Sequence, residues 1–415
     1  MSLIRPFKAV RPAEGKANLI AALPYDVMNS DEAREMVKGN PLSFLHIDKA
    51  EIDLPLGTNL YDEKVYQKAK ANLYQLLEEK HYLQDEKPCL YLYQQIMQGR
   101  KQTGLVCCAS IEEYENNLIK KHEHTRAEKE ADRIRHVDTT NAHTGPIFLT
   151  YRSLQTIEDR MNEIIRHKPL YDFIAEDQVC HRVWLIDQQN DLDFFVENFH
   201  KIPALYIADG HHRAASAVRI GQKRRAANQL HTGQEEYNFF LAVIFPDTQL
   251  KIMDYNRILK DLNGLSPDSY LQKIAEKFII EETTSPEPYH PECPHTFGMY
   301  LAGHAWFKLT AKPGSYPEND PVGALDVSIL QNNLLAPILA IGDPRTDLRI
   351  DFVGGIRGLK ELEKRVHSGE AVAFALHPTS IQELMSIADA NEVMPPKSTW
   401  FEPKLRSGLF VHLLD

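Results

Sequence analysis

One stretch of the sequence reads Asp209-Gly-His-His-Arg213 and combines a carboxylate, a glycine, two imidazoles and a guanidinium. An apolar run stops at Asp209, and small residues with helical spacing follow. Gly210 lets a ligand approach the backbone, and the free N–H groups of a helix N-terminus attract anions. Arg213 adds a planar fork that matches phosphate oxygens. The pattern predicts a phosphate-binding site, with His211 and His212 as further donors.

Other interpretations of the same residues remain open. Asp209 can hold a metal ion that the phosphates also bind, can orient a histidine, or can simply cap the helix. In the capping interpretation His211 and His212 are ordinary surface residues. Zinc is the poorer interpretation, because adjacent histidines rarely reach one ion and no third ligand follows at the usual spacing.

A second candidate is the polar segment 121–138, a dense mixture of bases, acids and cations. Glu123 is a candidate general base near a hydroxyl, and Arg126 is a candidate clamp for an anion. The alternative is a solvated charged helix. Lys129 and Arg133 then bring like charges together four residues apart, which destabilises a helix. Neither interpretation is decided by the residues alone.

Two further stretches contain possible ligand contacts. Pro24 fixes the backbone before Tyr25 and Asp26, and a Tyr-Asp pair at a strand end can bind a ligand, although turns also use Asp for local reasons. Residues 394–409 place Lys404 and other polar donors around two aromatic residues. This composition suits the edge of a ligand site or an anchored tail equally well.

The elements that must position these residues follow from periodicity. Apolar residues at helical spacing predict a helix over 61–80, and short apolar runs predict strands over 89–98, 103–111 and 239–246. Leu205–Ala208 is expected as a buried strand, with a helix that begins at Arg213. Strands and helices mix without strict βαβ order, which favours an α+β or mixed α/β fold.

Bulk composition limits the classes of function. The 415 residues carry a net charge of -11, which disfavours general nucleic-acid binding. The five cysteines form no C-x-x-C pair, and no apolar run approaches the roughly 20 residues of a membrane span. We expect a cytoplasmic protein that forms a single unit over 1–415. Its possible lobes are 1–284 and 295–415.

The sequence resembles the family known as domain of unknown function 1015 (DUF1015). Matching stretches run from end to end of the chain: RPFKAVRP, ALPYDVMNSDEAREMVKGNPLSFLHI, KKHEHTRAEKEADRIRH, YIADGHHRAASA, GDPRTDLRIDFVGGIRG and VMPPKSTWFEPKLRSGL. This resemblance indicates kinship rather than an activity.

The DGHHR stretch is also similar to a motif of the ParB/sulfiredoxin-like group, which includes free serine kinases. This second resemblance implies a ParB/sulfiredoxin-like core and nucleotide-phosphate contacts from Gly210, His211, His212 and Arg213. It also places Asp209 near a Mg²⁺ ion. A sulfiredoxin activity is disfavoured, because Ala208 precedes the motif and no cysteine lies near it in sequence.

The resulting hypothesis is a small-molecule kinase that uses ATP or a related nucleotide with Mg²⁺. Phosphoryl transfer needs charge neutralisation and positioning more than covalent help. Arg213, His212 and Arg126 would supply charge, and Glu123 or Asp26 would activate the hydroxyl of a metabolite such as free serine. The alternative is a regulator that binds a nucleotide or phosphometabolite without catalysis. A ParB-like DNA-associated protein or nuclease is the third hypothesis.

Overall fold

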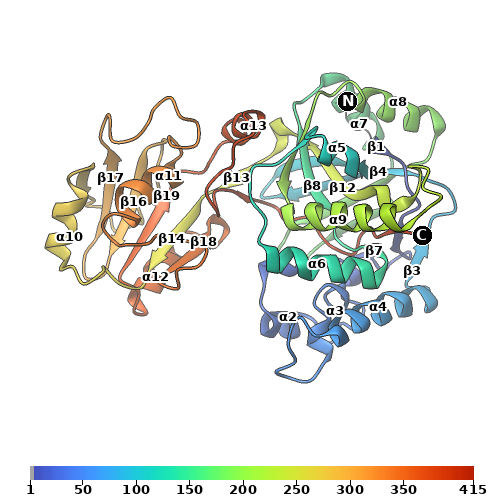
Figure 1. Cartoon of the computed structure of the whole chain (residues 1–415), viewed down its shortest axis with the longest axis horizontal. Coiled ribbons are helices and arrows are strands. Elements are labelled where there is room, and N and C mark those ends of the chain that lie inside the picture. Colours follow the sequence, from blue (N-terminus) through green and yellow to red (C-terminus); the bar gives the residue numbers. More distant parts are fainter. Residues whose placement is uncertain (1–3) are drawn as a thin grey trace. The chain divides into compact units, whose positions relative to one another are not determined.

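The computed structural model describes residues 4–415, which divide into two compact units (Figure 1). The first unit contains the chain up to Lys121, Thr125–Leu250 and Pro403–Asp415. The second contains His122–His124 and Lys251–Glu402, so the segment 285–294 lies inside it. The chain therefore leaves the first unit after residue 250 and returns to it at residue 403.

A nine-stranded mixed sheet forms the centre of the first unit. Eight of its strands lie in this order: β6 (Ile119–Lys120), β11 (Leu205–Asp209), β8 (Ile147–Tyr151), β12 (Phe239–Pro246), β5 (Arg100–Ser110), β4 (Leu90–Met97), β10 (Cys180–Ile186) and β9 (Tyr171–Ile174). The ninth strand, β1 (Ile4–Arg5), pairs with β5. The β6–β11 and β8–β12 pairs are parallel, and the others are antiparallel.

Apolar side chains that alternate along these strands form the main core. Every residue of β12 is buried, as its continuous apolar sequence predicts for a central strand. Three helices pack their apolar faces on one side of the sheet: α7 (Gln155–Ile164), α8 (Gln189–Phe199) and α9 (His211–Ala227). The small residues Ala214 and Ala217 let α9 lie close to the strands.

Two further helices extend this layer (Figure 1): α6 (Ala127–Thr140), which lies beside α9, and α4 (Glu63–Glu78), which lies beside α6. Lys223 of α9 pairs with Asp138 of α6, and Arg135 of α6 pairs with Glu63 of α4. These ion pairs lie mostly in solvent. The packing of buried faces therefore holds the helices together more than the ion pairs do.

Shorter elements complete the first unit. The helices are α1 (Ala17–Ile20), α2 (Ser30–Met36), α3 (Leu45–Asp48) and α5 (Ile111–Glu115). Two small antiparallel pairs join distant parts of the chain: β2 (Val10–Pro12) with β3 (Tyr82–Gln84), and β7 (Ala142–His143) with β21 (His412–Leu413). The second of these pairs holds the returning segment 403–415 against the loop before β8.

An antiparallel six-stranded sheet forms the second unit. Its strand order is β15 (Phe278–Glu282), β17 (Trp306–Ala311), β16 (Thr296–Leu301), β19 (Val372–Leu376), β14 (Tyr255–Leu259) and β18 (Ile350–Gly354). Its helices are α10 (Pro267–Ile274), α11 (Asp326–Leu330), which continues as one π-helical turn, α12 (Lys360–His367) and α13 (Ile381–Asp389). A short pair of β13 (Ile252–Met253) with β20 (Trp400–Phe401) joins the two ends of the inserted segment.

These units confirm the expected α+β class. The predicted helix 61–80 corresponds to α4, and the predicted strand 239–246 has the same bounds as β12. Within the described residues, no helix combines the length and the apolar character that a membrane crossing needs.

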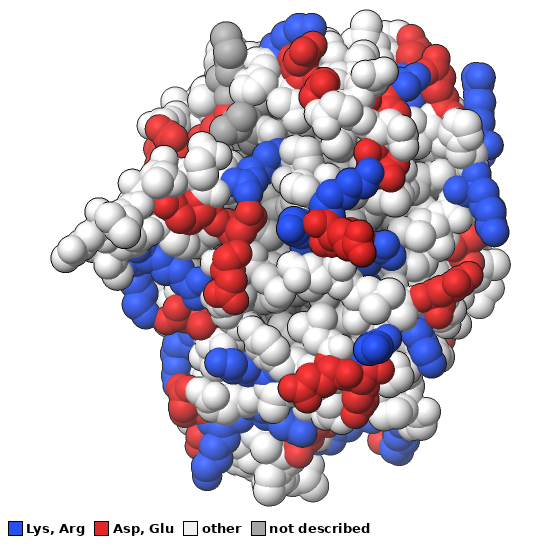
Figure 2. Space-filling view, turned by 90° about the vertical axis from the view of Figure 1, so that its right-hand side faces the viewer, with Lys and Arg blue, Asp and Glu red and all other residues white. Residues whose placement is uncertain are grey.

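Charges of both signs are interspersed on the face shown in Figure 2, and residues 4–415 form no broad area of one sign there. This arrangement agrees with the modest excess of acidic over basic residues in the sequence.

Candidate functional site

A tight turn joins β11 to α9 at the predicted phosphate-binding motif. Gly210 occupies the N-cap position with φ 95° and ψ 31°, a left-handed conformation that residues other than glycine rarely adopt. The helix begins at His211, two residues earlier than the expected start at Arg213. No side chain caps it, so Asp209 is not the N-cap. Instead, Asp209 Oδ1 accepts a hydrogen bond from the Gly210 N–H at 2.9 Å.

Two cations lie beside the Asp209 carboxylate. Lys404 Nζ donates to Asp209 Oδ2 at 3.2 Å, and Arg213 Nη2 lies 3.9 Å from the same oxygen. Burial alone would raise the pKa of Asp209, but the charges of Lys404 and Arg213 outweigh burial and hold the pKa well below its ordinary value. The group is therefore a carboxylate throughout the neutral range.

Arg213 is mostly buried, with 12% of its side chain exposed. Its Nη1 donates to the carbonyl oxygen of Pro146 at 2.6 Å, while its Nε is buried without a hydrogen-bond partner among the described residues. Burial lowers the pKa of Arg213, but the nearby carboxylates of Asp26 and Asp209 outweigh it and raise the pKa overall. The structure therefore brings Asp26, predicted from a separate stretch, into the electrostatic surroundings of Arg213.

A pocket within the first unit extends from Arg213. The pocket is narrow and partly open to solvent. The polar side chains that line it include Tyr25, Asp48, Arg133, His143, Arg213 and Ser407. Two guanidinium groups line this pocket, and they favour an anionic ligand, since each keeps its charge when buried.

The inward position of Arg133 helps to explain how the charged segment Ala127–Thr140 forms the helix α6. Its side chain turns inward, where Nη2 lies 2.8 Å from Asp132 Oδ2 and the guanidinium carbon lies 4.0 Å from the centre of the Tyr25 ring. Asp132 in turn accepts from the hydroxyl of Tyr66 at 2.9 Å. Because Asp132 and Arg133 are buried and paired, their like-charge neighbours on α6 do not prevent helix formation.

His212 and Arg126 meet in a way that the sequence did not suggest. The backbone N–H of Arg126, at the N-cap of α6, donates to His212 Nε2 at 3.0 Å. His212 therefore uses Nε2 as an acceptor, and this nitrogen links the start of α6 to the start of α9. The Arg126 residue is exposed.

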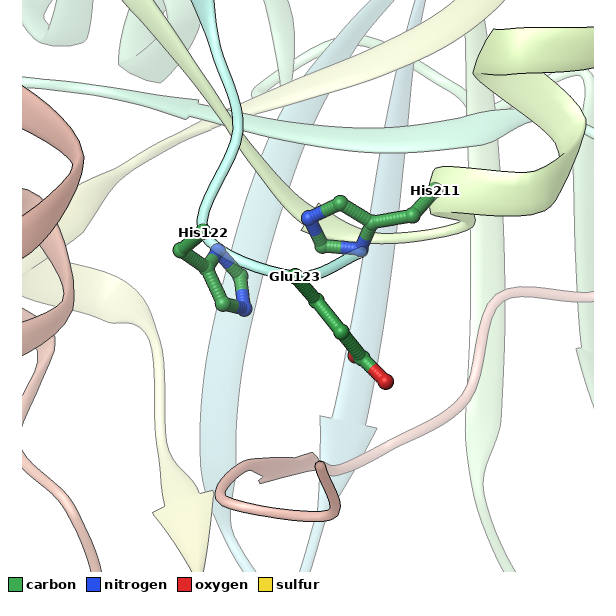
Figure 3. A group of neighbouring side chains, drawn as sticks. All are labelled: His122, Glu123 and His211. Carbon is green, nitrogen blue, oxygen red and sulfur yellow. The ribbon is translucent and has the colours of Figure 1, made fainter. Parts of the chain in front are cut away.

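Figure 3 shows two other predicted residues, Glu123 and His211, together with His122. His211 is buried in the first turn of α9, and Glu123 is partly buried after β6.

Sequence reasoning did not single out Asp48 and His143, and it left Lys404 undecided. Asp48 is buried and accepts a hydrogen bond from Thr144 at 2.8 Å. A usable signal for Asp48 was a carboxylate directly after Phe44–Ile47, a stretch in which His46 is the one residue that is not apolar. For His143, the signal was its position just before Gly145 and Pro146, at the entry to a buried strand.

Comparison with known proteins gives a family and several solved structures that match at low identity and low TM-score. The family model described as protein of unknown function (DUF1015) matches residues 4–328, more than half of the chain. No curated protein matches the sequence.

Three solved structures are similar over most of their length. A free serine kinase variant in complex with AMP has 12% identity and a TM-score of 0.38, covering 74% of this chain and 92% of that chain. A conserved hypothetical protein from Pyrococcus furiosus has 15% identity and a TM-score of 0.35, covering 75% and 95%. SbnI with C-terminal truncation from Staphylococcus aureus has 12% identity and a TM-score of 0.37, covering 74% and 87%.

Proposed function

Because the chain belongs to the DUF1015 family, described as proteins of unknown function, we propose an activity from its own side chains: it binds nucleotide phosphates at Asp209–Arg213. The observation that carries this proposal is the buried Nε of Arg213, which has no protein partner among the described residues and lies at the N-terminus of a long helix. A phosphate oxygen is a suitable acceptor for this donor.

The surrounding groups suit a phosphate chain. The first intrahelical hydrogen bond of α9 runs from the Ala214 N–H to the Gly210 carbonyl, so the N–H groups before it can face an anion. Arg213 and Lys404 would neutralise phosphate charge, and the left-handed Gly210 leaves the backbone accessible. His211 and His212 are the further contacts that we propose from the motif.

Asp209 is the residue that would hold Mg²⁺. Its side chain is ionised and 30% exposed, which leaves room for a cation that keeps most of its water and uses one carboxylate together with phosphate oxygens. When bound, Mg²⁺ would neutralise charge on the phosphates that are being transferred or held.

The finer proposal is phosphoryl transfer to the hydroxyl of a small metabolite, with free serine as one candidate. The acceptor hydroxyl would attack the terminal phosphorus, the bond to the bridging oxygen would break, and the hydroxyl proton would pass to a carboxylate. Asp26 is the better supported base, because its charge already acts on Arg213. Glu123 and the clamp Arg126 are the other residues that we propose from the sequence.

Thermal unfolding with ligands tests phosphate binding. We expect ATP, ADP, CTP or pyrophosphate, with and without Mg²⁺, to raise the melting temperature of the wild-type protein by mass action. Arg213→Ala and Arg213→Lys should lose most of this shift, because neither retains the guanidinium fork. Arg219→Ala removes an exposed arginine from the same helix and should keep the shift. If no phosphate compound shifts the wild type, the proposal is wrong.

Product analysis then separates the enzyme from the regulator. A kinase should release ADP when ATP is offered with a panel of small hydroxylated metabolites. Binding without turnover across the panel would support the alternative, a nucleotide- or phosphometabolite-binding regulator.

A further inference from the structure

A chain of buried polar side chains runs from the pocket of the first unit toward its surface. His143 of β7 lies opposite His412 of β21, and their Nδ1 atoms are 3.3 Å apart. His412 Nε2 is 2.7 Å from Glu236 Oε2, and Glu236 also pairs with Arg5. The two histidines are buried, with 6% and 2% of their surface exposed.

The hydrogen-bond partners assign the protons in this chain. Burial and the neighbouring His412 lower the pKa of His143, and burial lowers the pKa of His412 despite the opposing effect of Glu236. Both rings are therefore neutral near pH 7 and carry one N–H each. A carboxylate only accepts, so His412 bears its proton on Nε2 and accepts at Nδ1. His143 must then donate from Nδ1, which leaves its Nε2 without a proton.

The unprotonated nitrogen belongs to a pocket rich in donors and cations. His143 lines the same pocket as Arg133, Arg213 and Ser407. Its Nε2 is buried and has no hydrogen-bond partner in the described part of the chain. A buried acceptor without a partner is unfavourable, so a ligand or water that offers an O–H or N–H group would be stabilised there.

We infer that the pocket binds a small hydroxylated anion, with its anionic group near the two arginines and a ligand hydroxyl that donates to His143 Nε2. The anionic half of this inference rests on the proposed function. The contact to the ligand hydroxyl makes His143 a specificity-determining residue. It would distinguish a hydroxylated phosphate or carboxylate from its deoxy analogue. Glu236 and His412 are positioning residues, since they act through the tautomer of His143.

The tautomer can be measured without a ligand. In ¹⁵N NMR spectra of the full chain with labelled histidine, His143 should show a protonated Nδ1 and an unprotonated Nε2 near pH 7. Glu236→Gln can donate as well as accept, so it should weaken this preference and give a mixture of tautomers. A protonated Nε2 or a doubly protonated His143 ring in the wild type would contradict the inference.

A pair of variants separates the two nitrogens of His143. His143→Asn can place an amide N–H donor where Nδ1 of His143 was, but it leaves no acceptor at the position of Nε2. His143→Gln can place its amide oxygen, an acceptor, near that position. The probes are glycerol 3-phosphate, propyl phosphate and inorganic phosphate, with binding measured by calorimetry and folding checked by thermal unfolding.

We expect the wild type to prefer glycerol 3-phosphate over propyl phosphate by about tenfold, the scale of one hydrogen bond in a buried site. His143→Asn should lose this preference, His143→Gln should keep most of it, and inorganic phosphate should bind all three proteins similarly. If the wild type binds phosphate without preferring the hydroxylated probe, the role of His143 is refuted. The same holds if His143→Asn prefers glycerol 3-phosphate as strongly as the wild type does. Neither outcome would refute phosphate binding itself. If none of the three probes binds the wild type, this inference fails, and the thermal shifts with ATP, ADP, CTP and pyrophosphate decide the proposed function separately.

Discussion

Asp209 keeps its charge in a confined place because Lys404 and Arg213 lie beside it. The hydrogen bond from Lys404 is 3.2 Å long and joins residues that are 195 positions apart in the chain. The carboxylate therefore links the motif to the returning segment 403–415, and it holds Arg213 toward the pocket rather than toward solvent.

The charge of Asp209 should be visible in acid unfolding. Its pKa in the folded protein lies below the unfolded value of about 3.9, so its stabilising effect is complete above that pH and is lost as the pH falls through the folded pKa. We expect the difference in unfolding free energy between wild type and Asp209→Asn to shrink as the pH falls from about 5 to 2. Urea unfolding at several pH values measures it, and a constant difference would contradict the assignment.

Lys404 should contribute to phosphate affinity in addition to its ion pair with Asp209. Lys404→Gln removes a cation that is 11% exposed, and we expect ATP affinity to fall by about tenfold, comparable to a charged hydrogen bond. Lys223→Gln is the control, because Lys223 lies on α9 with 65% of its side chain exposed. Calorimetric titration of both variants with ATP checks this, and equal losses would indicate a general charge effect.

At the scale of elements, the turn from β11 to α9 depends on the conformation of Gly210. A Cβ atom at this position would lie 3.1 Å from Arg213 Nε, in addition to the strain of a positive φ. The turn therefore both starts the helix and leaves room for the arginine that folds back beside it.

A matched pair of glycine substitutions separates these two effects. Gly99, in the hairpin between β4 and β5, has φ +79°, and a Cβ atom added there would meet no other atom within 4 Å. Gly99→Ala should cost about 1 kcal/mol or slightly more from backbone strain alone. Gly210→Ala should cost more, and only Gly210→Ala should weaken the thermal shift by ATP. Equal destabilisation with unchanged ATP binding would exclude a role for the close approach to Arg213.

Most elements could be predicted from local sequence, because a buried strand and an amphipathic helix each have a distinct apolar period. β12 and α4 are examples. Helix starts are harder to predict: the sequence offers Asn29 and Ser30 as neighbouring N-cap candidates for α2, and Asn29 caps it through a capping box with Glu32. Both residues have suitable oxygens, so composition could not choose between them.

The charged stretch around Arg345 shows that a period of two can mislead. Its alternating charges suggest an edge strand or a pocket wall, but β18 begins only at Ile350. Arg345 pairs with Asp343 two residues away, and Arg349 pairs with Asp347. Local ion pairs in a loop therefore produce the same period of two that a strand gives.

The candidate site could be predicted only in part. The turn and Asp26 carry local signals, whereas the partners of Arg213 and Asp209 come from other elements far along the chain. From the sequence, Arg133 is only a repulsive neighbour of Lys129, because helical spacing alone does not show which charges turn inward. The ParB/sulfiredoxin-like relationship and the cytoplasmic location stay predictions.

At the scale of the whole molecule, the balance of charge bears on the DNA hypothesis. The net charge is -11, and acidic and basic side chains alternate on the face in Figure 2. Binding to a phosphate backbone requires a positive surface whose counterions are released.

We therefore expect no measurable binding of duplex DNA at about 150 mM salt, where non-specific affinities are already weak. Fluorescence anisotropy with a labelled duplex at several salt concentrations measures this. A steep fall of affinity with rising salt would instead support the DNA-associated alternative.

The return of the chain to the first unit also sets an order of assembly during synthesis. Asp209 and Arg213 leave the ribosome before the whole inserted segment 251–402, and Lys404 follows it. At about 5–20 residues per second, roughly 10–40 s separate Asp209 from Lys404. During that interval a nascent chain carries the motif without its lysine, so a product that stalls inside the insertion cannot complete the Lys404–Asp209 pair.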